Sequence, residues 1–171
     1  MIKIRQATIK DAEKIAYIKV ITWKDTYKNL LDASYLSRLK VTQATIRKWE
    51  KRIVNAKNKK TFIWVALESN QIVGFLWGGE SRVPKIEKLD LEIYGLYVLP
   101  QYQHQGIGKK LFLTFNNRVG NEFFLWMLKG NKSELFYEKL KCKKSKYLNP
   151  VTIGNKQYQE IAFVYKNILS G

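Results

Sequence analysis

The first third of the chain carries apolar residues at the spacing of amphipathic helices. After Thr8, apolar positions recur three or four residues apart, and Asp11 stands where a capping box places its acidic residue, so a first helix is expected here. Residues 31–39 suit a short second helix, and the apolar face of residues 42–57 predicts a third. Residues 2–7 have the composition of an opening strand.

From residue 61 the pattern is that of strands. Residues 62–67 and 72–77 are rich in β-branched and aromatic side chains, and the polar residues between them predict a hairpin turn. A third, longer strand is expected over residues 88–99. Simple alternation would place four of its side chains on one face: Glu92, Tyr94, Leu96 and Val98.

The remaining chain predicts a helix that starts near Gly106, an apolar strand over residues 123–128, a short helix over 133–140 and a closing strand over 158–165. No repeat and no linker rich in glycine, serine or proline interrupts this pattern. Residues 1–171 are therefore predicted to form one α/β domain with a mixed sheet.

Composition narrows the class of protein. Apolar residues make up 46% of the chain and aromatic residues 13%, which is enough for a packed core. Cys142 is the only cysteine, so no internal disulfide can form and a cytoplasmic location is expected. The N-terminus lacks the apolar region of a signal peptide, and no uncharged run reaches the roughly 18 residues of a membrane span. One histidine and one cysteine cannot supply a zinc site, so no metal is expected.

The chain is also strongly basic, with 31 Lys and Arg against 14 Asp and Glu and a net charge of +17. A net positive charge of this size creates an electric field that attracts the phosphates of nucleic acid, of lipid headgroups or of a phosphorylated cofactor. No RNA-binding or DNA-recognition pattern accompanies the charge, so nucleic acid is not expected as a partner. The lysine-rich run over residues 139–146 is read as a solvated face or as a surface that steers an anionic ligand.

The most specific local pattern runs from Val98 to Leu111, where a strand end leads through a glycine-bearing loop into a helix. The first backbone N–H groups of a helix have no partner inside it, and glycine lets a phosphate approach closely, so the pattern predicts an anion site. The spacing fits neither the GxGxxG loop nor the phosphate loop of nucleotide-binding folds. Helix capping by the two glycines is the alternative.

Within this pattern, Gln103-His104-Gln105-Gly106-Ile107-Gly108 resembles the [QR]xxGx[GA] motif of the GNAT superfamily of N-acetyltransferases, and Leu96-Tyr97-Val98 before Pro100 resembles the strand end that precedes it. The resemblance implies a central, mostly antiparallel twisted sheet flanked by helices, with splayed strands where acetyl-CoA binds. It also implies that the loop amides hold the pyrophosphate and that the strand pairs with the pantetheine arm. The residues assigned to acetyl-CoA in this way are Leu96, Tyr97, Val98, Gln103, His104, Gln105, Gly106, Ile107, Gly108 and Lys109.

Glu92 is the candidate general base. An alkylamine has an ordinary pKa of about 10.4, so a base must remove a proton before the amine can attack. Glu92 lies 14 residues before Gly106, and histone-acetylating members of the superfamily carry their general-base glutamate at this spacing. Apolar neighbours on the predicted face would desolvate the carboxylate. A surface position, a salt bridge with a lysine and a water chain in place of Glu92 all stay open.

Tyr137 is the candidate proton donor for the leaving thiolate. The segment from Asn131 through Ser133 to Phe136-Tyr137 resembles a late helix of the superfamily. The resemblance implies that Tyr137 protonates the sulfur, that Asn131 hydrogen-bonds the pantetheine and that Phe136 contacts the cofactor. The backbone N–H of Val98 would polarise the thioester carbonyl. Core packing is the alternative for Tyr137.

The acceptor side is less specific. Trp23 and Tyr27 lie in a block that resembles an N-terminal segment of bacterial members, and they are candidates for substrate contact, with core packing as the alternative. The function implied is transfer of an acetyl group from acetyl-CoA to a primary amine by direct attack in a ternary complex, and the resemblance allows a homodimer. A non-catalytic module that binds acyl-CoA or nucleic acid through the basic surface is the alternative.

The positive charge disfavours strongly cationic acceptors unless an acidic pocket exists. The candidates for such a pocket are Asp25, Asp32, Glu80, Glu87 and Asp90. Lys141-Cys142 also replaces the Gly-Phe that usually follows the late helix of the superfamily. Because glycine permits a left-handed cap, Lys141 predicts a strained or different helix exit, and Cys142 is expected to be structural.

Overall fold

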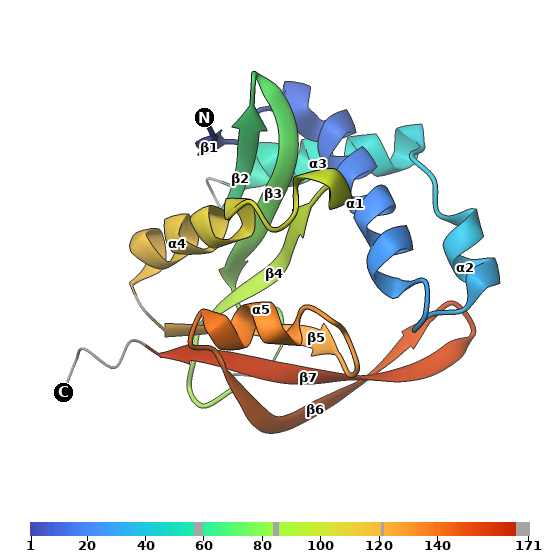
Figure 1. Cartoon of the computed structure of the whole chain (residues 1–171), viewed down its shortest axis with the longest axis vertical. Coiled ribbons are helices and arrows are strands. Elements are labelled where there is room, and N and C mark those ends of the chain that lie inside the picture. The colour runs from blue at the N-terminus through green and yellow to red at the C-terminus, as the bar shows by residue number, and fades with distance from the viewer. Residues whose placement is uncertain (57–59, 84–85, 121, 167–171) are drawn as a thin grey trace.

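A seven-stranded sheet forms the centre of the computed structural model, which describes residues 1–56, 60–83, 86–120 and 122–166 (Figure 1). Neighbouring strands run antiparallel except for one parallel pair in the middle of the sheet. This confirms the mixed, mostly antiparallel sheet. In order across the sheet, the strands are β1 (Lys3–Gln6), β2 (Thr61–Glu68), β3 (Gln71–Glu80), β4 (Leu91–Val98), β5 (Glu122–Leu128), β7 (Lys156–Lys166) and β6 (Lys143–Ile153).

Helices flank this sheet: α1 (Ala12–Tyr27), α2 (Ala33–Arg38), α3 (Gln43–Asn55), α4 (Ile107–Val119) and α5 (Glu134–Lys139). Ile63 and Val65 of β2 pack with α1 and α3, whereas Trp64 and Ala66 pack with α4 on the opposite face. All five helices were expected from the sequence; residue 57, where the third was predicted to end, lies outside the described residues. Within the described ranges, no helix has both the length and the apolar character needed to cross a bilayer.

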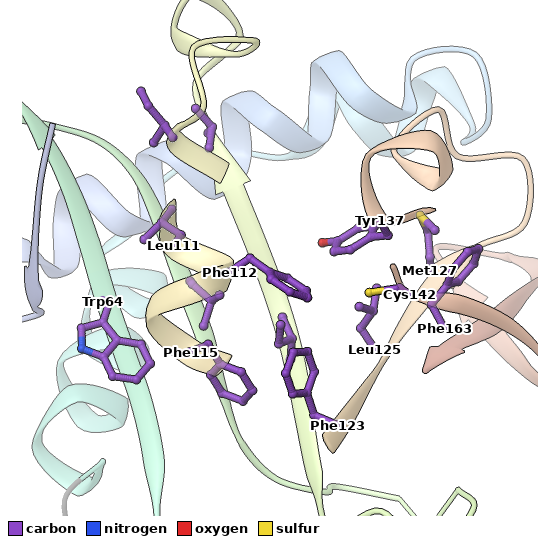
Figure 2. Packing of buried hydrophobic residues seen from close by; sticks show 14 of the residues in the cluster. Trp64, Leu111, Phe112, Phe115, Phe123, Leu125, Met127, Tyr137, Cys142 and Phe163 are labelled. Atoms are coloured by element: carbon purple, nitrogen blue, oxygen red, sulfur yellow. The ribbon is translucent and has the colours of Figure 1, made fainter. Parts of the chain in front are cut away.

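The core beneath α4 contains several aromatic rings among aliphatic side chains (Figure 2). Leu111 and Phe115 follow Ile107 at helical spacing, and all three are buried. Phe115 meets Phe123 of β5 edge to face, with ring centroids 5.0 Å apart. This packing fixes the position of α4 against β5, and with it the position of the loop that precedes α4.

An ion pair fastens the start of α1 to β1. Arg5 lies 2.6 Å from the Asp11 carboxylate, which also accepts a hydrogen bond from the backbone N–H of Thr8 at 2.7 Å. Burial alone would raise the pKa of Asp11, but the hydrogen bonds from Arg5 and Thr8 outweigh burial and lower it. The Thr8–Asp11 spacing therefore does mark a helix start, although a short 3₁₀ turn precedes the α-helix.

A β-bulge interrupts β4. Trp77 of β3 lies opposite Gly95, and the next residue, Gly78, lies opposite Ile93. Tyr94 is therefore an extra residue on β4 that no residue of β3 pairs with. A bulge of this kind reverses the alternation of side chains beyond it.

The bulge overturns one prediction from the sequence. Leu96 and Val98 do not share a face with Glu92. They pack with Ile93 in the core under α4, whereas Tyr97 joins the cluster formed by α1 and α3. A strict period of two cannot reveal an inserted residue, so the face was assigned wrongly beyond Tyr94.

The sequence also failed to predict β6. Its residues are mostly exposed on both faces, because β6 lies at the edge of the sheet and pairs only with β7. Four of its first five positions are Lys or Tyr and it contains Pro150, so neither an apolar alternation nor a buried run marks it as a strand. The lysine run read as a solvated face is largely the start of this edge strand.

Candidate functional site

The parallel strands β4 and β5 separate at the centre of the sheet. Among the described residues they pair only at Glu92 with Phe124 and at Ile93 with Leu125. Beyond these pairs, the segment Leu96–Val98 is paired with β3 on one side only. The strands are therefore splayed, as expected, and the open edge of β4 offers backbone groups with which an extended amide can pair.

The backbone N–H of Val98 points into this gap. Leu99 donates its N–H to the carbonyl of Val73 on β3, at 2.9 Å. Because successive N–H groups of a strand point to opposite edges, the N–H of Val98 faces the β5 side. A donor is thus available where the two strands part.

The loop between β4 and α4 ends at Gly106, which caps the helix with a φ of +78°. The first backbone bond of α4 runs from the N–H of Lys110 to the carbonyl of Gly106, at 3.0 Å. The three preceding N–H groups, from Ile107 to Lys109, therefore have no acceptor inside the helix. Next to them, a Cβ on Gly108 would come within 3.1 Å of the Phe136 ring, so glycine keeps this approach open.

Two glutamine side chains hold this loop in shape. Gln103 donates its amide to the carbonyl of Val98 at 2.9 Å, and Gln105 donates to Gln101 at 3.1 Å. His104, between them, is exposed and has a left-handed φ of +61°. In this structure the two glutamines tie the loop to itself and to the end of β4.

Tyr137 of α5 lies on the far side of the gap. The side chain is only 7% exposed, and its ring meets that of Phe136 with centroids 5.0 Å apart. Figure 2 shows the hydroxyl pointing away from α5 towards β4, and no partner for it is recorded among the described residues. Burial raises the pKa of Tyr137, so at neutral pH the phenol keeps its proton.

Contacts from α1 bring the other predicted residues to the same gap. Trp23 donates its indole N–H to the hydroxyl of Tyr97 at 3.3 Å, and its ring meets that of Tyr27 with centroids 5.0 Å apart. The amide of Asn131 donates to the Tyr27 hydroxyl at 3.4 Å, while its oxygen accepts from the N–H of Ser133. The proposed substrate and cofactor residues therefore form one continuous group.

Glu92 is fully buried, and among the described residues its carboxylate is hydrogen-bonded by Arg82. One carboxylate oxygen lies 2.5 Å from the Arg82 guanidinium, and the other accepts the backbone N–H of Arg82 at 3.0 Å. The guanidinium also lies 4.2 Å from the centroid of the Tyr94 ring. The salt bridge left open by the sequence does exist, but its partner is an arginine and the site is not on the surface.

Sequence reasoning missed Glu160. It lies on β7 opposite Leu128, at the end of β5 beyond the splay, and accepts a hydrogen bond from Asn149 at 3.0 Å. Burial is the main cause that raises the pKa of Tyr27 and of Tyr97, and the charge of Glu160 adds a smaller contribution in the same direction. Nothing in the sequence marks this carboxylate, because its proximity depends on β7 lying next to β5.

A cavity of about 410 Å³ lies close to this end of β5, between its last residues and the β6–β7 hairpin. Its lining includes Leu30, Leu128 and Tyr158. None of the predicted site residues lines it, so this cavity does not belong to the group of residues at the splay.

The backbone at the end of α5 is strained, but it follows the usual path of a helix C-terminus. The N–H of Cys142 donates to the carbonyl of Tyr137, and that of Lys141 to Glu138, which is the pair of bonds of a Schellman motif. Lys141 itself has a φ of +69°. Cys142 is buried after the motif, and burial raises the pKa of its thiol to about 12. The chain therefore leaves α5 through a Schellman motif, and Lys141 occupies the left-handed position where glycine is usual.

Replacing Lys141 with glycine is expected to stabilise the protein. A left-handed conformation costs a non-glycine residue about 1–2 kcal/mol, and part of this gain is offset by the extra entropy of an unfolded glycine, about 0.5–1 kcal/mol. Urea denaturation should show a free energy of unfolding higher by roughly 0.5–1 kcal/mol. The matched control, Lys139→Gly within the helix, should lower it by about 1 kcal/mol. A loss of stability in Lys141→Gly would contradict the assignment of strain.

Comparison with known proteins points to one family. Residues 59–141 match the family model described as an acetyltransferase (GNAT) domain. The chain is 29% identical over 143 residues to YuaI, an uncharacterized N-acetyltransferase of Bacillus subtilis strain 168, covering 81% of this chain and 78% of that one. It is 26% identical over 113 residues to a spermidine N(1)-acetyltransferase of Thermoplasma acidophilum, covering 66% of each.

Solved structures share the whole fold. The structure of the PaiA N-acetyltransferase from Thermoplasma acidophilum in complex with coenzyme A aligns with a TM-score of 0.72 and 23% identity, covering 98% of this chain and 99% of that one. YncA from Salmonella typhimurium, titled a putative acetyltransferase with its cofactor acetyl-CoA, aligns with a TM-score of 0.67 and 17% identity, covering 99% and 96%.

Proposed function

We propose that the chain is a GNAT N-acetyltransferase, which its similarity to that family model and to curated N-acetyltransferases supports, and that it moves an acetyl group from acetyl-CoA to a primary amine by direct attack in a ternary complex. The observation that carries the proposal is the open edge of β4 directly before the N-terminus of α4. An extended amide chain can pair with such an edge while a diphosphate meets the helix N-terminus. The structures of PaiA and YncA, which hold coenzyme A or acetyl-CoA, support this choice of donor.

In this proposal the backbone does most of the donor binding. The N–H groups of Ile107, Gly108 and Lys109 receive the pyrophosphate, and the exposed side chains of Lys109 and Lys110 add charge for the phosphates. Leu96–Val98 pair with the pantetheine arm. Asn131 and Phe136 complete the donor site from the other side of the gap.

The chemistry requires three groups around the thioester. The backbone N–H of Val98 donates to the carbonyl oxygen and polarises it. As the amine attacks, a C–N bond forms and the C–S bond breaks, and Tyr137 gives its proton to the departing sulfur. The proton lost from the amine passes to a base. The hydroxyl of Tyr137 suits its role because it is protonated and has no recorded partner among the described residues.

Glu92 is proposed as that base, acting through water. The carboxylate is fully buried, so an acceptor amine cannot touch it directly, and Arg82 already occupies both oxygens. A water chain along Arg82 and Tyr94 would link the gap with the carboxylate. The two possibilities that the sequence left open, a carboxylate base and a water relay, then become parts of one pathway.

Replacing Glu92 with glutamine is expected to lower kcat by about 10²-fold at pH 7, at the lower end of the usual effect of a general base. The deficit should narrow above about pH 9, because more of the free amine is then deprotonated without help. The measurement is kcat against pH from 6 to 10. A constant small deficit at every pH would assign Glu92 a structural role with Arg82.

The first experiment is a thermal-shift titration with acetyl-CoA, with ATP as the phosphate control. A ligand at about 100 times its Kd stabilises the folded state by roughly 2.7 kcal/mol. A shift specific to acetyl-CoA, followed by amine-dependent release of the thiol, would support the transferase. Binding without amine-dependent release of the thiol would favour the acyl-CoA-binding alternative. Equal thermal shifts with ATP would indicate that the loop is only a general anion site.

A further inference from the structure

We propose that the amine acceptor carries an acidic group, a carboxylate or a phosphate, and that Lys19 and Arg52 bind this group in a cavity between α1 and α3. The inference rests on the proposed acetyl transfer and names the class of its acceptor. Charge, shape and position relative to the splay each support it.

The cavity, called the hollow below, is lined by cationic and aromatic side chains. It has a volume of about 200 Å³ and is lined from α1 by Lys19 and Trp23, and from α3 by Lys48, Trp49 and Arg52. None of the described residues that line it is acidic. A hollow of this composition suits an anionic group attached to a short organic chain.

Its two inner cations lack acidic partners. Among the described residues, Lys19 lies over the Trp23 ring, and Arg52 lies 4.6 Å and 4.2 Å from the centroids of the Trp49 and Trp77 rings, but neither forms an ion pair with a carboxylate. Arg guanidinium and Lys ammonium groups bind carboxylates and phosphates through charge-assisted hydrogen bonds. An anionic ligand would supply the charge that the protein itself does not.

The cations also oppose one another. Burial first, and then the charges of Arg52, Lys48 and Arg82, lowers the pKa of Lys19 to about 8. Arg52 and Lys48 belong to α3, and Arg82 to the segment after β3; Tyr35 of α2 and Lys40 after it also line the cavity with Lys19. Gathering like charges in a half-buried site costs stability unless a ligand offsets it.

The acids considered for an acidic pocket are engaged elsewhere. Four of them pair with surface lysines: Asp25 with Lys28, Asp32 with Lys156, Glu80 with Lys60 and Glu87 with Lys166. A polycationic acceptor would therefore meet a positive surface in the hollow. The structure favours an acceptor with an acid at one end and an amine at the other.

The hollow is connected to the reaction site. Trp23 lines it and at the same time donates to Tyr97 at the splay. Glu160 of β7, opposite Leu128 at the end of β5 beyond the splay, is the carboxylate that we assign to the ammonium end of the acceptor. The two ends of the acceptor thus meet opposite charges.

Matched amines test the class directly. With saturating acetyl-CoA, thiol release is compared for L-lysine against cadaverine, for O-phosphoethanolamine against ethanolamine, and for spermidine. The expected result is a kcat/KM at least tenfold higher for the acid-bearing member of one pair, and the pair that responds distinguishes carboxylate from phosphate. Preference for spermidine or for the amines without an acid would overturn the proposal.

A binding measurement does not depend on turnover. Tryptophan fluorescence is titrated with acetate and with inorganic phosphate while coenzyme A fills the donor site. At least one anion should bind, with a Kd at least tenfold weaker in Arg52→Gln and in Lys19→Met, and unchanged in Arg47→Gln, an exposed position on the same helix. Lys19→Met removes a charge that burial disfavours, so this variant is expected to fold.

The pH dependence of the same titration provides a further test. Affinity of the native protein for the anion should fall as pH rises through about 8, where Lys19 loses its charge, and Lys19→Met should lack this fall. Equal affinity in all variants, or no binding of either anion, would overturn the anion site. Failure of the acetyl-CoA thermal shift is a separate result, and it would count against the proposed transfer instead.

Discussion

Replacing Tyr137 with phenylalanine is expected to lower kcat by about 10³-fold and to leave the KM for acetyl-CoA nearly unchanged. Donation of a proton in the transition state contributes about 10²–10⁴-fold, and the Tyr137 hydroxyl is the group proposed to donate it across the gap between β4 and β5. The ring makes the packing contacts with Phe112 and Phe136, and phenylalanine retains them. The measurement is steady-state thiol release with the best acceptor.

A matched control separates acid catalysis from packing. Tyr165 lies against the same core, with its ring 5.2 Å from that of Phe112, and Tyr165→Phe should change kcat by less than about twofold. Both variants should unfold within a few tenths of a kcal/mol of the native protein, as conservative changes usually do. An unchanged kcat in Tyr137→Phe would assign the tyrosine to the core alone.

Placing an aspartate at Gly108 is expected to weaken acetyl-CoA binding by about 10³-fold. The new carboxylate would stand in the first turn of α4, beside the N–H groups proposed to receive the pyrophosphate. Two like charges about 4 Å apart near a protein surface repel by about 4 kcal/mol, and 1.4 kcal/mol corresponds to a tenfold change in affinity. Isothermal titration with acetyl-CoA measures the Kd directly.

Gly108→Asn is the control for this change, because asparagine has nearly the same size without the charge. A Cβ at this position already presses on the Phe136 ring at 3.1 Å, so Gly108→Asn should show a smaller loss that reports shape alone. Gly108→Asp should keep its fold, since an acid in the first turn of a helix is favourable. In both variants the Phe136 ring has to shift by only a few tenths of an ångström. Equal losses in the two variants would mean that the loop excludes side chains but does not bind the pyrophosphate.

The proposed acceptor chemistry also bears on the net charge of +17. The donor is polyanionic, and the inferred acceptor carries an acid, so a positive field would draw both substrates to the same protein. The surface carboxylates form ion pairs with lysines outside the hollow between α1 and α3. The hollow therefore keeps its positive charge. On this proposal, small phosphorylated or carboxylated ligands are the partners that the positive charge of the chain would serve.

Local patterns were enough to predict most of the elements. The helix at residues 107–119 follows from apolar residues at helical spacing after Gly106, and the strand at 122–128 follows from an unbroken apolar run. The loop between Gln103 and Gly108 was recognisable because its backbone geometry requires glycine at a defined place. These features depend on neighbours in the chain, so the sequence contains the information needed to predict them.

Other features depend on which strands become neighbours. Beyond the bulge at Tyr94, the side chains of β4 lie on the face opposite to the one that simple alternation predicts. No periodicity in the sequence indicates an inserted residue. The approach of Glu160 and the hollow shared by Lys19 and Arg52 join segments far apart in the sequence. Glu92 meets Arg82, ten residues earlier, because β3 and β4 pair. The sequence by itself determined the helices, most strands and the donor loop, because periodicity and glycine geometry are local. Only the tertiary structure decided the acceptor side, because its charges meet through the packing of α1 and α3 on the sheet.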